Sequence, residues 1–311
     1  MSEINNYLDY INSCAKNDPE GLIFRSESRF KNIITSVAQR AVSSQGHTAI
    51  MLSGPSASGK TTTAGKIAEA LRAQGVNAFT ISLDDFYKNK EDAALLEDGT
   101  PDLESVHALD IDLISSTLNR IIETGESELP VFDFSTGKRS EKKGYIKLEK
   151  DDVIIVEGLH ALNPLVNENL PEGKTLKIYI SVSSRIYGEN QKIILNKRNL
   201  RFTRRLVRDF QFRSSSVENT YSLWPAVLRG EDLFLAPYKL NSDIQINSIH
   251  IYEPCVLKQI ALPLLYESIK NDNSFFEEDA RKLIRGLESF ETIPASMVPE
   301  FSLLREFLGK N

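Results

Sequence analysis

A glycine-rich loop between an apolar strand and a helix constrains this chain more than any other feature. Residues 54–61 read GPSASGKT and satisfy G-x-x-x-x-G-K-[ST], with the apolar run AIML before them and a helical pattern over residues 62–73 after them. Glycines let backbone N–H groups converge on phosphate oxygens, and the helix N-terminus adds partial positive charge. The loop therefore predicts a site for the phosphates of a nucleotide, formed by Gly54, Pro55, Ser56, Ala57, Ser58, Gly59, Lys60, Thr61 and Thr62.

Two side chains of the loop have distinct expected roles. In loops of this kind the lysine, here Lys60, reaches the β- and γ-phosphates, and the following hydroxyl, here Thr61, ligates Mg²⁺. ATP and Mg²⁺ are accordingly the predicted cofactors. The loop alone does not separate a kinase from a GTPase or an ATP-driven motor, because function lies in the site and not in the fold.

The rest of the chain predicts an α/β fold of the P-loop NTPase type. Short apolar strands alternate with helices, which is typical of a parallel sheet with helices on both faces; the strands are expected at residues 48–53, 77–83, 153–156, 176–182 and 243–247. Residues 130–134 and 145–148 flank a turn with Gly137 and Gly144, which predicts a β-hairpin insertion. Helical patterns precede and follow this core, with breaks at residues 19–21 and near Pro294.

Three acids are expected at the carboxyl ends of two strands. Asp84 and Asp85 close the second strand, and Glu157 closes the third, at the edge of the sheet where the phosphate loop also lies. We expect Asp84 to lie near the metal and to act as the base for a hydroxyl that attacks the γ-phosphorus. Glu157 is expected to hold Mg²⁺, directly or through water, although a helix-capping role stays open for both acids. Asp85 is expected to be structural.

A basic stretch is expected to close over the nucleotide. Residues 190–212 predict one long helix, and between Lys192 and Arg213 there are eight Lys or Arg residues and one acid, Asp209. Arg205 and Arg208 share a helical face, and with Arg213 they are expected to form a lid near residues 185–215 that stabilises the transferring phosphoryl group. A solvated charged face is the alternative, and Arg201 and Arg204 could line the site or face solvent.

Composition limits the other classes of function. A net charge of −6 argues against general nucleic-acid binding, which depends on neutralising phosphates, and the basic stretch lacks Tyr or Trp for stacking on bases. Cys14 and Cys255 lack metal or redox spacing, which favours a reducing cytoplasm. The first ten residues resemble no secretory leader, and no apolar run reaches the roughly 20 residues of a membrane span. We therefore expect a cytoplasmic protein with a small-molecule substrate and no membrane or nucleic-acid partner.

Five motifs in order resemble the uridine kinase/phosphoribulokinase family of P-loop kinases. They are GPSASGKT, LDDFY, VFDFSTGKR, VIIVEGLHALN and RFTRRLVRDFQFR, and they span residues 48–247, while the later residues resemble a bacterial uridine kinase-like branch. The resemblance implies an ATP-dependent kinase that phosphorylates a hydroxyl, most simply the 5′-hydroxyl of a nucleoside such as uridine or cytidine. It also implies three parts: an N-terminal helical extension (1–45), a kinase domain (46–250) and a C-terminal helical extension (251–311).

The resemblance assigns the acceptor side residue by residue. The family's base and metal ligand falls on Asp84, and the aromatic residue that lies against the nucleobase falls on Tyr87. The family carboxylate that binds the ribose 2′- and 3′-hydroxyls is matched by Glu104, where Asp is usual. Arg205 is expected to reach the substrate as well as the phosphates.

The hairpin motif departs from the family at one position. Its aromatic residue is Phe132 and its last residue is Arg139, both expected at the substrate, but the histidine that contacts the base is replaced by Gly137. A phosphoribulokinase-like enzyme acting on a sugar phosphate or another alcohol therefore stays open, as does a non-catalytic nucleotide-binding regulator. The sequence leaves undecided the acceptor, ATP versus GTP, a homo-oligomer, feedback regulation and the role of the N-terminal helices.

Overall fold

The computed structural model describes residues 4–43, 49–95, 99, 101–134, 136–168, 170, 174–270 and 274–309. Three predicted positions lie outside the described residues: Thr48 at the start of the first strand, Ser135 in the hairpin motif, and Lys310 at the end of the C-terminal helical pattern. The ends of the predicted N-terminal and C-terminal extensions lie outside them too.

Five parallel strands form the central sheet, as the sequence predicts. The strand order is β11-β8-β1-β7-β2, so β7 lies between the strand that leads into the phosphate loop and the strand that leads to Asp84. All neighbouring pairs are parallel. Short runs rich in Val, Ile and Ala suit strands covered on both faces. The bounds are β1 (Ala49–Ser53), β2 (Ala78–Ser82), β7 (Val153–Glu157), β8 (Thr175–Ser181) and β11 (Ile244–Asn247).

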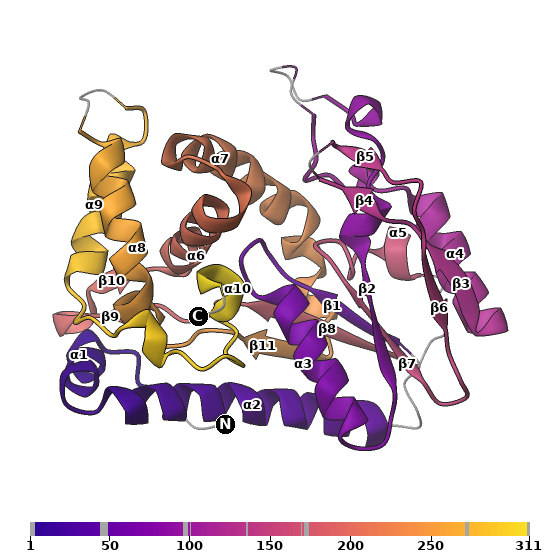
Figure 1. Ribbon diagram of the computed structural model, residues 1–311, viewed down its shortest axis with the longest axis horizontal. Coiled ribbons are helices and arrows are strands. Elements are labelled where there is room, and N and C mark those ends of the chain that lie inside the picture. The colour runs from indigo at the N-terminus through magenta and orange to yellow at the C-terminus, as the bar shows by residue number, and fades with distance from the viewer. Residues whose placement is uncertain are drawn as a thin grey trace.

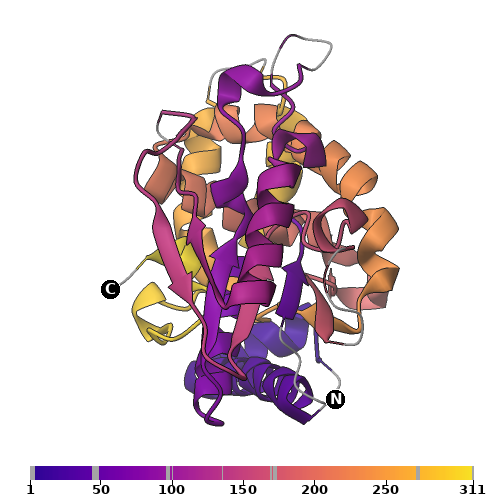
Figure 2. The same ribbon diagram turned by 90° about the vertical axis from the view of Figure 1, so that its right-hand side faces the viewer.

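Helices cover both faces of this sheet. Because side chains alternate along a strand, Ile50 and Leu52 pack on the side of α3 (Lys60–Arg72), whereas Met51 packs on the side of α4 (Ile111–Thr124). The four-residue helix α5 (Pro164–Asn167) contacts α4. Figure 2, seen from the side of α4 and the hairpin, shows α4 in front of the sheet.

Two N-terminal helices pack beneath the sheet and its helices. The sequence predicts the break at residues 19–21, but it lies at Asp18, after α1 (Leu8–Asn17). Pro19 is the first residue of α2 (Pro19–Ser43), a position where its missing N–H costs no hydrogen bond. Figure 1 shows α2 running along the base of the molecule, and it packs against α3. These helices are therefore part of the support of the phosphate loop.

The hairpin insertion is built differently from the prediction. The sequence pattern places residues 145–148 opposite residues 130–134, but β6 (Gly144–Lys147) pairs with β3 (Glu126–Leu129), and β4 (Phe132–Asp133) pairs with β5 (Lys138–Arg139). Pro130 has no N–H for a ladder hydrogen bond and separates the two pairs. The sequence of β3, ESEL, has only a weak alternation of charged and apolar residues, so it is not recognised as a strand from sequence.

The basic stretch is helical over a shorter range than predicted. Residues 190–196 are not part of the long helix: β9 (Ile186–Tyr187) and β10 (Ile193–Leu195) form a small antiparallel pair around the short η4 (Glu189–Gln191). The side chains and backbones of Asn196 and Asn199 form a capping box that begins α6 (Lys197–Arg213). After Ser216 the chain continues as α7 (Val217–Phe234).

The C-terminal part is less helical than expected. Its α-helices are α8 (Glu253–Ser268), α9 (Glu277–Glu288) and α10 (Arg305–Leu308), and between α9 and α10 the chain forms only the short η6 (Ala295–Met297). Pro294 and Pro299 lie in that interval and disfavour helix in the residues before them. Other single 3₁₀ turns are η1 (Leu83–Phe86), η2 (Lys90–Asp92), η3 (Val106–Ala108) and η5 (Ala236–Asn241).

One apolar core joins all three predicted parts of the chain. It includes Phe30 from α2, Ile50 from β1, Ile67 from α3, Val256 from α8 and Leu303 before α10. The N- and C-terminal segments therefore pack on the same face of the sheet as the phosphate-loop helix. Within the described residues, no helix combines the length and the apolar character needed to cross a membrane.

Two arginines of α6 are structural. Arg204 is fully buried; its Nε donates to Glu253 Oε2 (3.1 Å) and its Nη2 donates to the Ser248 carbonyl (2.9 Å). Arg201 pairs with Glu231, and its Nε donates to the Ser56 carbonyl of the phosphate loop (3.0 Å). The alternative that these two side chains face solvent is therefore wrong, because both are buried against carboxylates.

We predict that Glu253→Ala destabilises the protein strongly. The substitution leaves Arg204 buried without its counter-charge, which typically costs about 3–5 kcal/mol of the free energy of unfolding. Urea unfolding of the full chain measures this. Asp232→Ala is the matched control, because the Arg198–Asp232 pair is mostly exposed and its loss should cost no more than about 1 kcal/mol. Equal losses in the two variants would contradict the prediction.

Candidate active site

The phosphate loop needs glycine at its first and sixth positions. A Cβ atom at Gly54 would lie 2.1 Å from the Ile180 carbonyl oxygen of the neighbouring strand, so no larger residue fits there. Gly59 has φ +87°, in the left-handed region, and caps the start of α3. Glycine at these two positions lets the backbone turn tightly from β1 into α3. The N–H groups of the loop then lie at the N-terminus of the helix, where an anion can bind.

Glu157 joins the phosphate loop to the neighbouring strand. It ends β7 in register with Leu52 of β1 and Ser82 of β2, and its side chain is buried. Its Oε1 accepts hydrogen bonds from Thr61 Oγ1 (3.0 Å) and Ser82 Oγ (3.0 Å). Ser82 is absent from the predicted site residues, although a hydroxyl at the end of the strand before Asp84 could have indicated it.

Charges converge around Glu157. Burial raises the pKa of the Glu157 carboxyl, and the negative charge of Asp84 raises it further, while the Lys60 ammonium and the two hydroxyl hydrogen bonds oppose the shift. Asp84 and Lys60 therefore act on the same small volume as Glu157. The predicted base, phosphate-binding lysine and metal-binding acid come together at one edge of the sheet.

The oxygen atoms at this corner suit a hard divalent cation. Thr61 offers a hydroxyl, and Glu157 and Asp84 offer carboxylates, which are the ligand types that Mg²⁺ prefers. Across the described ranges, no group of three or more His, Cys, Asp or Glu side chains is arranged as a metal cage. Mg²⁺ in nucleotide sites is usually held by one or two carboxylates together with substrate phosphates and waters, and the Thr61–Glu157 corner fits that arrangement.

The two aspartates after β2 have different surroundings. Asp84 is exposed, and its backbone N–H donates to Ser82 Oγ (3.3 Å) at the start of η1. Asp85 Oδ1 accepts a hydrogen bond from the Phe132 backbone N–H (3.2 Å) and so ties the hairpin to the strand end. Asp85 has the structural contact expected from the sequence, and the Asp84 carboxyl is left accessible to substrate.

One buried carboxylate organises the three predicted lid arginines. The Asp209 carboxylate forms ion pairs with Arg205 Nε (3.2 Å), Arg208 Nη2 (2.7 Å) and Arg213 Nε (3.6 Å). Arg205 Nη1 also donates to Ser56 Oγ of the phosphate loop (3.0 Å). In the sequence Asp209 is the single acid of the basic stretch, and its i,i+4 spacing from Arg205 and Arg213 permits these pairs on one helix; no local pattern places them beside the loop.

Aromatic rings line the acceptor side. Tyr87 and Phe132 have ring centroids 5.7 Å apart, Tyr87 and Phe134 6.3 Å, and Phe132 and Phe134 5.0 Å. The Tyr87 hydroxyl donates to the Leu103 carbonyl (3.1 Å). Gly137 adopts φ +69°, and a Cβ there would lie 3.2 Å from Lys90 Cβ, so position 137 suits glycine and contributes no side chain.

Glu104 and Arg139, the other two predicted substrate residues, have different partners. Burial raises the pKa of Glu104, the positive charge of Arg205 opposes this, and Lys60 and Asp84 are also within electrostatic range. Glu104 packs against Gly230 of α7, where a Cβ would lie 2.5 Å from Glu104 Cβ. Arg139 donates to Asp110 Oδ2 (3.2 Å) and the Tyr87 carbonyl (3.1 Å), so its contact with substrate stays a prediction.

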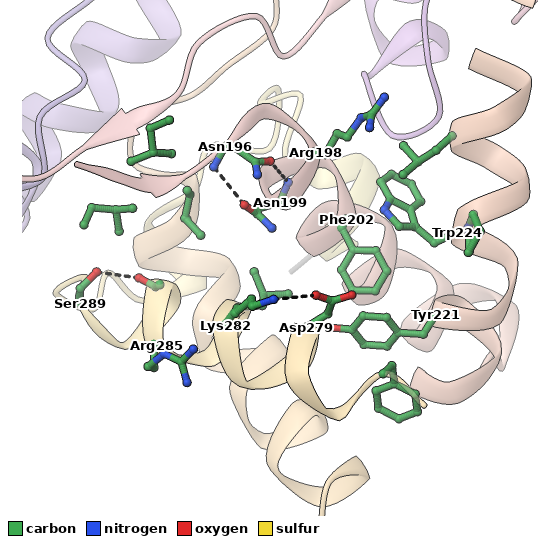
Figure 3. Close-up of a pocket in the computed structure, with 18 of the residues that line it drawn as sticks. Asn196, Arg198, Asn199, Phe202, Tyr221, Trp224, Asp279, Lys282, Arg285 and Ser289 are labelled. Carbon is green, nitrogen blue, oxygen red and sulfur yellow. Dashed lines mark hydrogen bonds and ion pairs between the residues drawn. The ribbon is translucent and has the colours of Figure 1, made fainter. Parts of the chain in front are cut away.

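A separate cavity lies on another face of α6. It has a volume of about 1160 Å³ and is lined by residues of β10, α6, α7 and α9, among them Phe202, Tyr221 and Trp224. Figure 3 shows these rings together with the Lys282–Asp279 pair. None of the predicted site residues lines this cavity, whereas Arg201, Arg204 and Arg205 contact the phosphate loop from α6. The chemistry predicted from sequence belongs to the phosphate-loop side.

A family model and several known proteins match this chain. The model of the phosphoribulokinase / uridine kinase family matches residues 49–253. The chain belongs to this family. A uridine kinase of Macrococcus caseolyticus is 32% identical over 64% of this chain and 87% of that protein, and one of Lactobacillus johnsonii is 30% identical over 63% and 83%. A solved structure described as a possible uridine kinase from Bacillus stearothermophilus is 18% identical, covers 71% of this chain and 99% of that chain, and has a TM-score of 0.46. This member of the family is an ATP-dependent kinase.

We predict that nucleotide binding with Mg²⁺ depends on pH through Glu157. Its pKa is raised above the ordinary value of 4.5, and only the ionised carboxylate attracts the cation, so affinity for MgADP should fall as the pH drops through that raised pKa. Calorimetric titration with MgADP at several pH values tests this. Glu157→Gln, which resembles the protonated group, should bind weakly at neutral pH and lose this pH dependence.

Metal-free ADP is the control for this titration, and its affinity should change less with pH. The variant should not lose stability, because a buried carboxylate with a raised pKa disfavours folding when it is ionised. An unchanged pH profile in Glu157→Gln would remove Glu157 from the metal site.

Proposed function

We propose that this kinase transfers the γ-phosphoryl group of ATP to the 5′-hydroxyl of a nucleoside. The single observation that carries the proposal is the arrangement of the acceptor side, where Tyr87 follows the strand end that bears Asp84 and forms an aromatic wall with Phe132 and Phe134. A planar base can pack on such rings, and a sugar attached to it would extend toward Asp84. The names of the relatives, which are uridine kinases, support the same class of acceptor.

Glu104 is proposed to hold the ribose. Its carboxylate lies within electrostatic range of Asp84, Lys60 and Arg205. A carboxylate accepts hydrogen bonds from two adjacent hydroxyl groups, so it suits the 2′- and 3′-hydroxyls of a ribose. Its added methylene relative to Asp gives it a longer reach from η3 and the turn before it.

Each group of site residues has its own role in the proposed phosphoryl transfer. The loop N–H groups and Lys60 hold the phosphates, and Asp84 accepts the proton of the attacking hydroxyl, so that the O–P bond to the acceptor forms as the bond to ADP breaks. Mg²⁺, held by Thr61, Glu157 and Asp84, would neutralise charge on the phosphate oxygens. Arg205 and Arg208 stabilise the negative charge of the transferring group.

The arginines are proposed to act from a pre-set position. Asp209 is buried and pairs with Arg205, Arg208 and Arg213, so their side chains lose little freedom when the triphosphate arrives. Each guanidinium still has N–H groups that point away from Asp209 and can donate to phosphate oxygens.

One observation favours a second acceptor class. Gly137 stands where nucleoside kinases of the family have a histidine, and its left-handed backbone beside Lys90 leaves no side chain to contact a base edge. A sugar phosphate or another alcohol in the same pocket would need no such contact. The chemistry at Asp84 and Lys60 would be the same for either acceptor.

Asp84→Asn should remove activity without removing nucleotide binding. General-base catalysis contributes roughly a hundredfold to ten-thousandfold, so kcat should fall at least about a hundredfold. Coupled detection of ADP measures turnover, and calorimetry with ADP measures binding. Asp85→Asn is the matched neighbour and should retain much more activity, because Asp85 Oδ1 meets the Phe132 N–H and not the phosphates. Unchanged turnover in Asp84→Asn would exclude it as the base.

A panel of acceptors decides the substrate class. Uridine, cytidine and purine nucleosides are compared with sugar phosphates and with small polyols, each by ADP release. Glu104→Gln should raise KM for a nucleoside about tenfold or more and leave KM for ATP nearly unchanged, because a hydrogen bond to a charged group is lost only at the acceptor. Turnover of anionic sugars alone would contradict the nucleoside proposal.

A further inference from the structure

A segment beyond the family match contacts the phosphate loop. The family model ends at residue 253, yet residues 299–309, called here the C-terminal segment, lie against the loop and the first turns of α3. Leu303 packs on Gly59, where a Cβ would lie 2.6 Å from Leu303 Cδ1, and Lys66 Nζ donates to the Phe301 carbonyl. Thr62 Oγ1 donates to Glu306 Oε2 at 2.6 Å. In Figure 1, α10 (yellow) lies beside α6 and close to α3.

The C-terminal segment is anchored from both sides. Ser302 Oγ and Tyr252 Oη both donate to the buried Glu27 Oε1 of α2, at 2.5 and 2.6 Å. The guanidinium of Arg204 lies 5.2 Å from the ring centroid of Phe307. Burial alone would raise the pKa of Glu27, but His250 and the two hydroxyls lower it to about 2, so Glu27 is ionised and holds its donors at neutral pH. Glu306 is therefore presented from a fixed support.

A carboxylate at this position cannot bind phosphate. Phosphate oxygens only accept hydrogen bonds at neutral pH, and an ionised carboxylate also only accepts, so the two repel each other. The donors of a nucleotide belong to its nucleoside half: the ribose hydroxyls and, in adenine, the exocyclic amine. Thr62 follows Thr61, the expected metal ligand, so Glu306 lies at the edge of the expected phosphate site, where the attached nucleoside half can supply a donor.

We propose that Glu306 is a specificity residue of the ATP site, and that it accepts a hydrogen bond from a donor of the nucleoside half of ATP. The C-terminal segment thereby forms one wall of that half of the site. This inference rests on ATP as the phosphoryl donor and not on which acceptor is used. The Glu306 side chain is partly exposed, so it can exchange the Thr62 hydroxyl for a nucleotide donor without a change of fold.

The charge balance near Glu306 is consistent with this role. Arg213 lies within electrostatic range of Glu306, and also of Asp209 and Asp84. The nearby positive charge reduces the repulsion between the carboxylate and a bound α-phosphate. The C-terminal segment therefore adds a hydrogen-bond acceptor for the nucleoside half of ATP, while the charge of Arg213 offsets its negative charge near the phosphates.

Calorimetric titration of the full chain with ADP tests the role of Glu306. Glu306→Ala should weaken ADP binding about tenfold to a hundredfold, which is the usual range for loss of a hydrogen bond to a charged group. Glu300→Ala is the matched control, because Glu300 belongs to the same segment, is 59% exposed and lies 3.9 Å from Arg305, and it should leave ADP binding unchanged. KM for the acceptor should stay the same in both variants.

Nucleotide analogues identify the donor. 2′-Deoxy-ADP and 3′-deoxy-ADP each lack one ribose hydroxyl, and IDP lacks the exocyclic amine. The analogue that lacks the recognised donor should bind the unmodified protein at least tenfold more weakly than ADP, and this discrimination should disappear in Glu306→Ala. Equal discrimination in both proteins would overturn the proposal.

Two further outcomes are decisive. If Glu306→Ala binds ADP as tightly as the unmodified protein, or more tightly, the carboxylate repels phosphate and the proposal is wrong. If Glu306→Ala does not fold, Glu306→Gln, which has nearly the same shape, supplies the same comparison and should lose most of the affinity that depends on the negative charge. ADP binding needs no acceptor, so a failure of the nucleoside proposal leaves this test intact.

Discussion

The site depends on one buried carboxylate between two hydroxyl groups. Glu157 lies at the end of the strand between β1 and β2, and it accepts from Thr61 on one side and Ser82 on the other. Burial raises its pKa, so its ionised form is costly unless Lys60, these hydroxyls or a cation compensate. The strand order places the Glu157 carboxylate at the edge of the sheet where the phosphates and the acceptor are proposed to meet. A rigid parallel sheet, covered on both faces, keeps this carboxylate buried in that position.

Buried ion pairs extend the same logic to the arginine helix. Arg201 and Arg204 pair with Glu231 and Glu253 and donate to carbonyl groups of the phosphate loop. Such pairs seldom add net stability, but they fix orientation because breaking them leaves a buried charge. They hold α6 against the loop, and Asp209 then sets the directions of Arg205 and Arg208. The position of the proposed catalytic arginines therefore depends on residues that the sequence pattern alone could assign to surface charge.

Prediction from sequence was most successful where one local pattern suffices. The loop from Gly54 to Thr61, the five apolar strands and the acids at their ends follow from spacing and from the rule that parallel strands end at a common edge. It was least successful where pairing is decided by distant residues. The partner strand of Gly144–Lys147 is β3, in which polar and apolar residues alternate only weakly. The start of α6 depends on the cap at Asn196. The contact of Glu306 with Thr62 joins residues 244 positions apart, which no local pattern encodes.

The sequence alone determined the class of chemistry. A phosphate loop, a lysine, a hydroxyl and two strand-terminal acids restrict the chain to nucleotide-dependent transfer, because those residue types at those spacings have few other uses. Only the tertiary structure decided which charges are paired inside the protein and which face the site. Burial and counter-charges are set by packing between segments far apart in the chain. Arg204 and Arg205, neighbours in sequence, therefore have different partners: Glu253 holds Arg204 in the core, whereas Arg205 pairs with Asp209 and donates to the Ser56 hydroxyl of the phosphate loop.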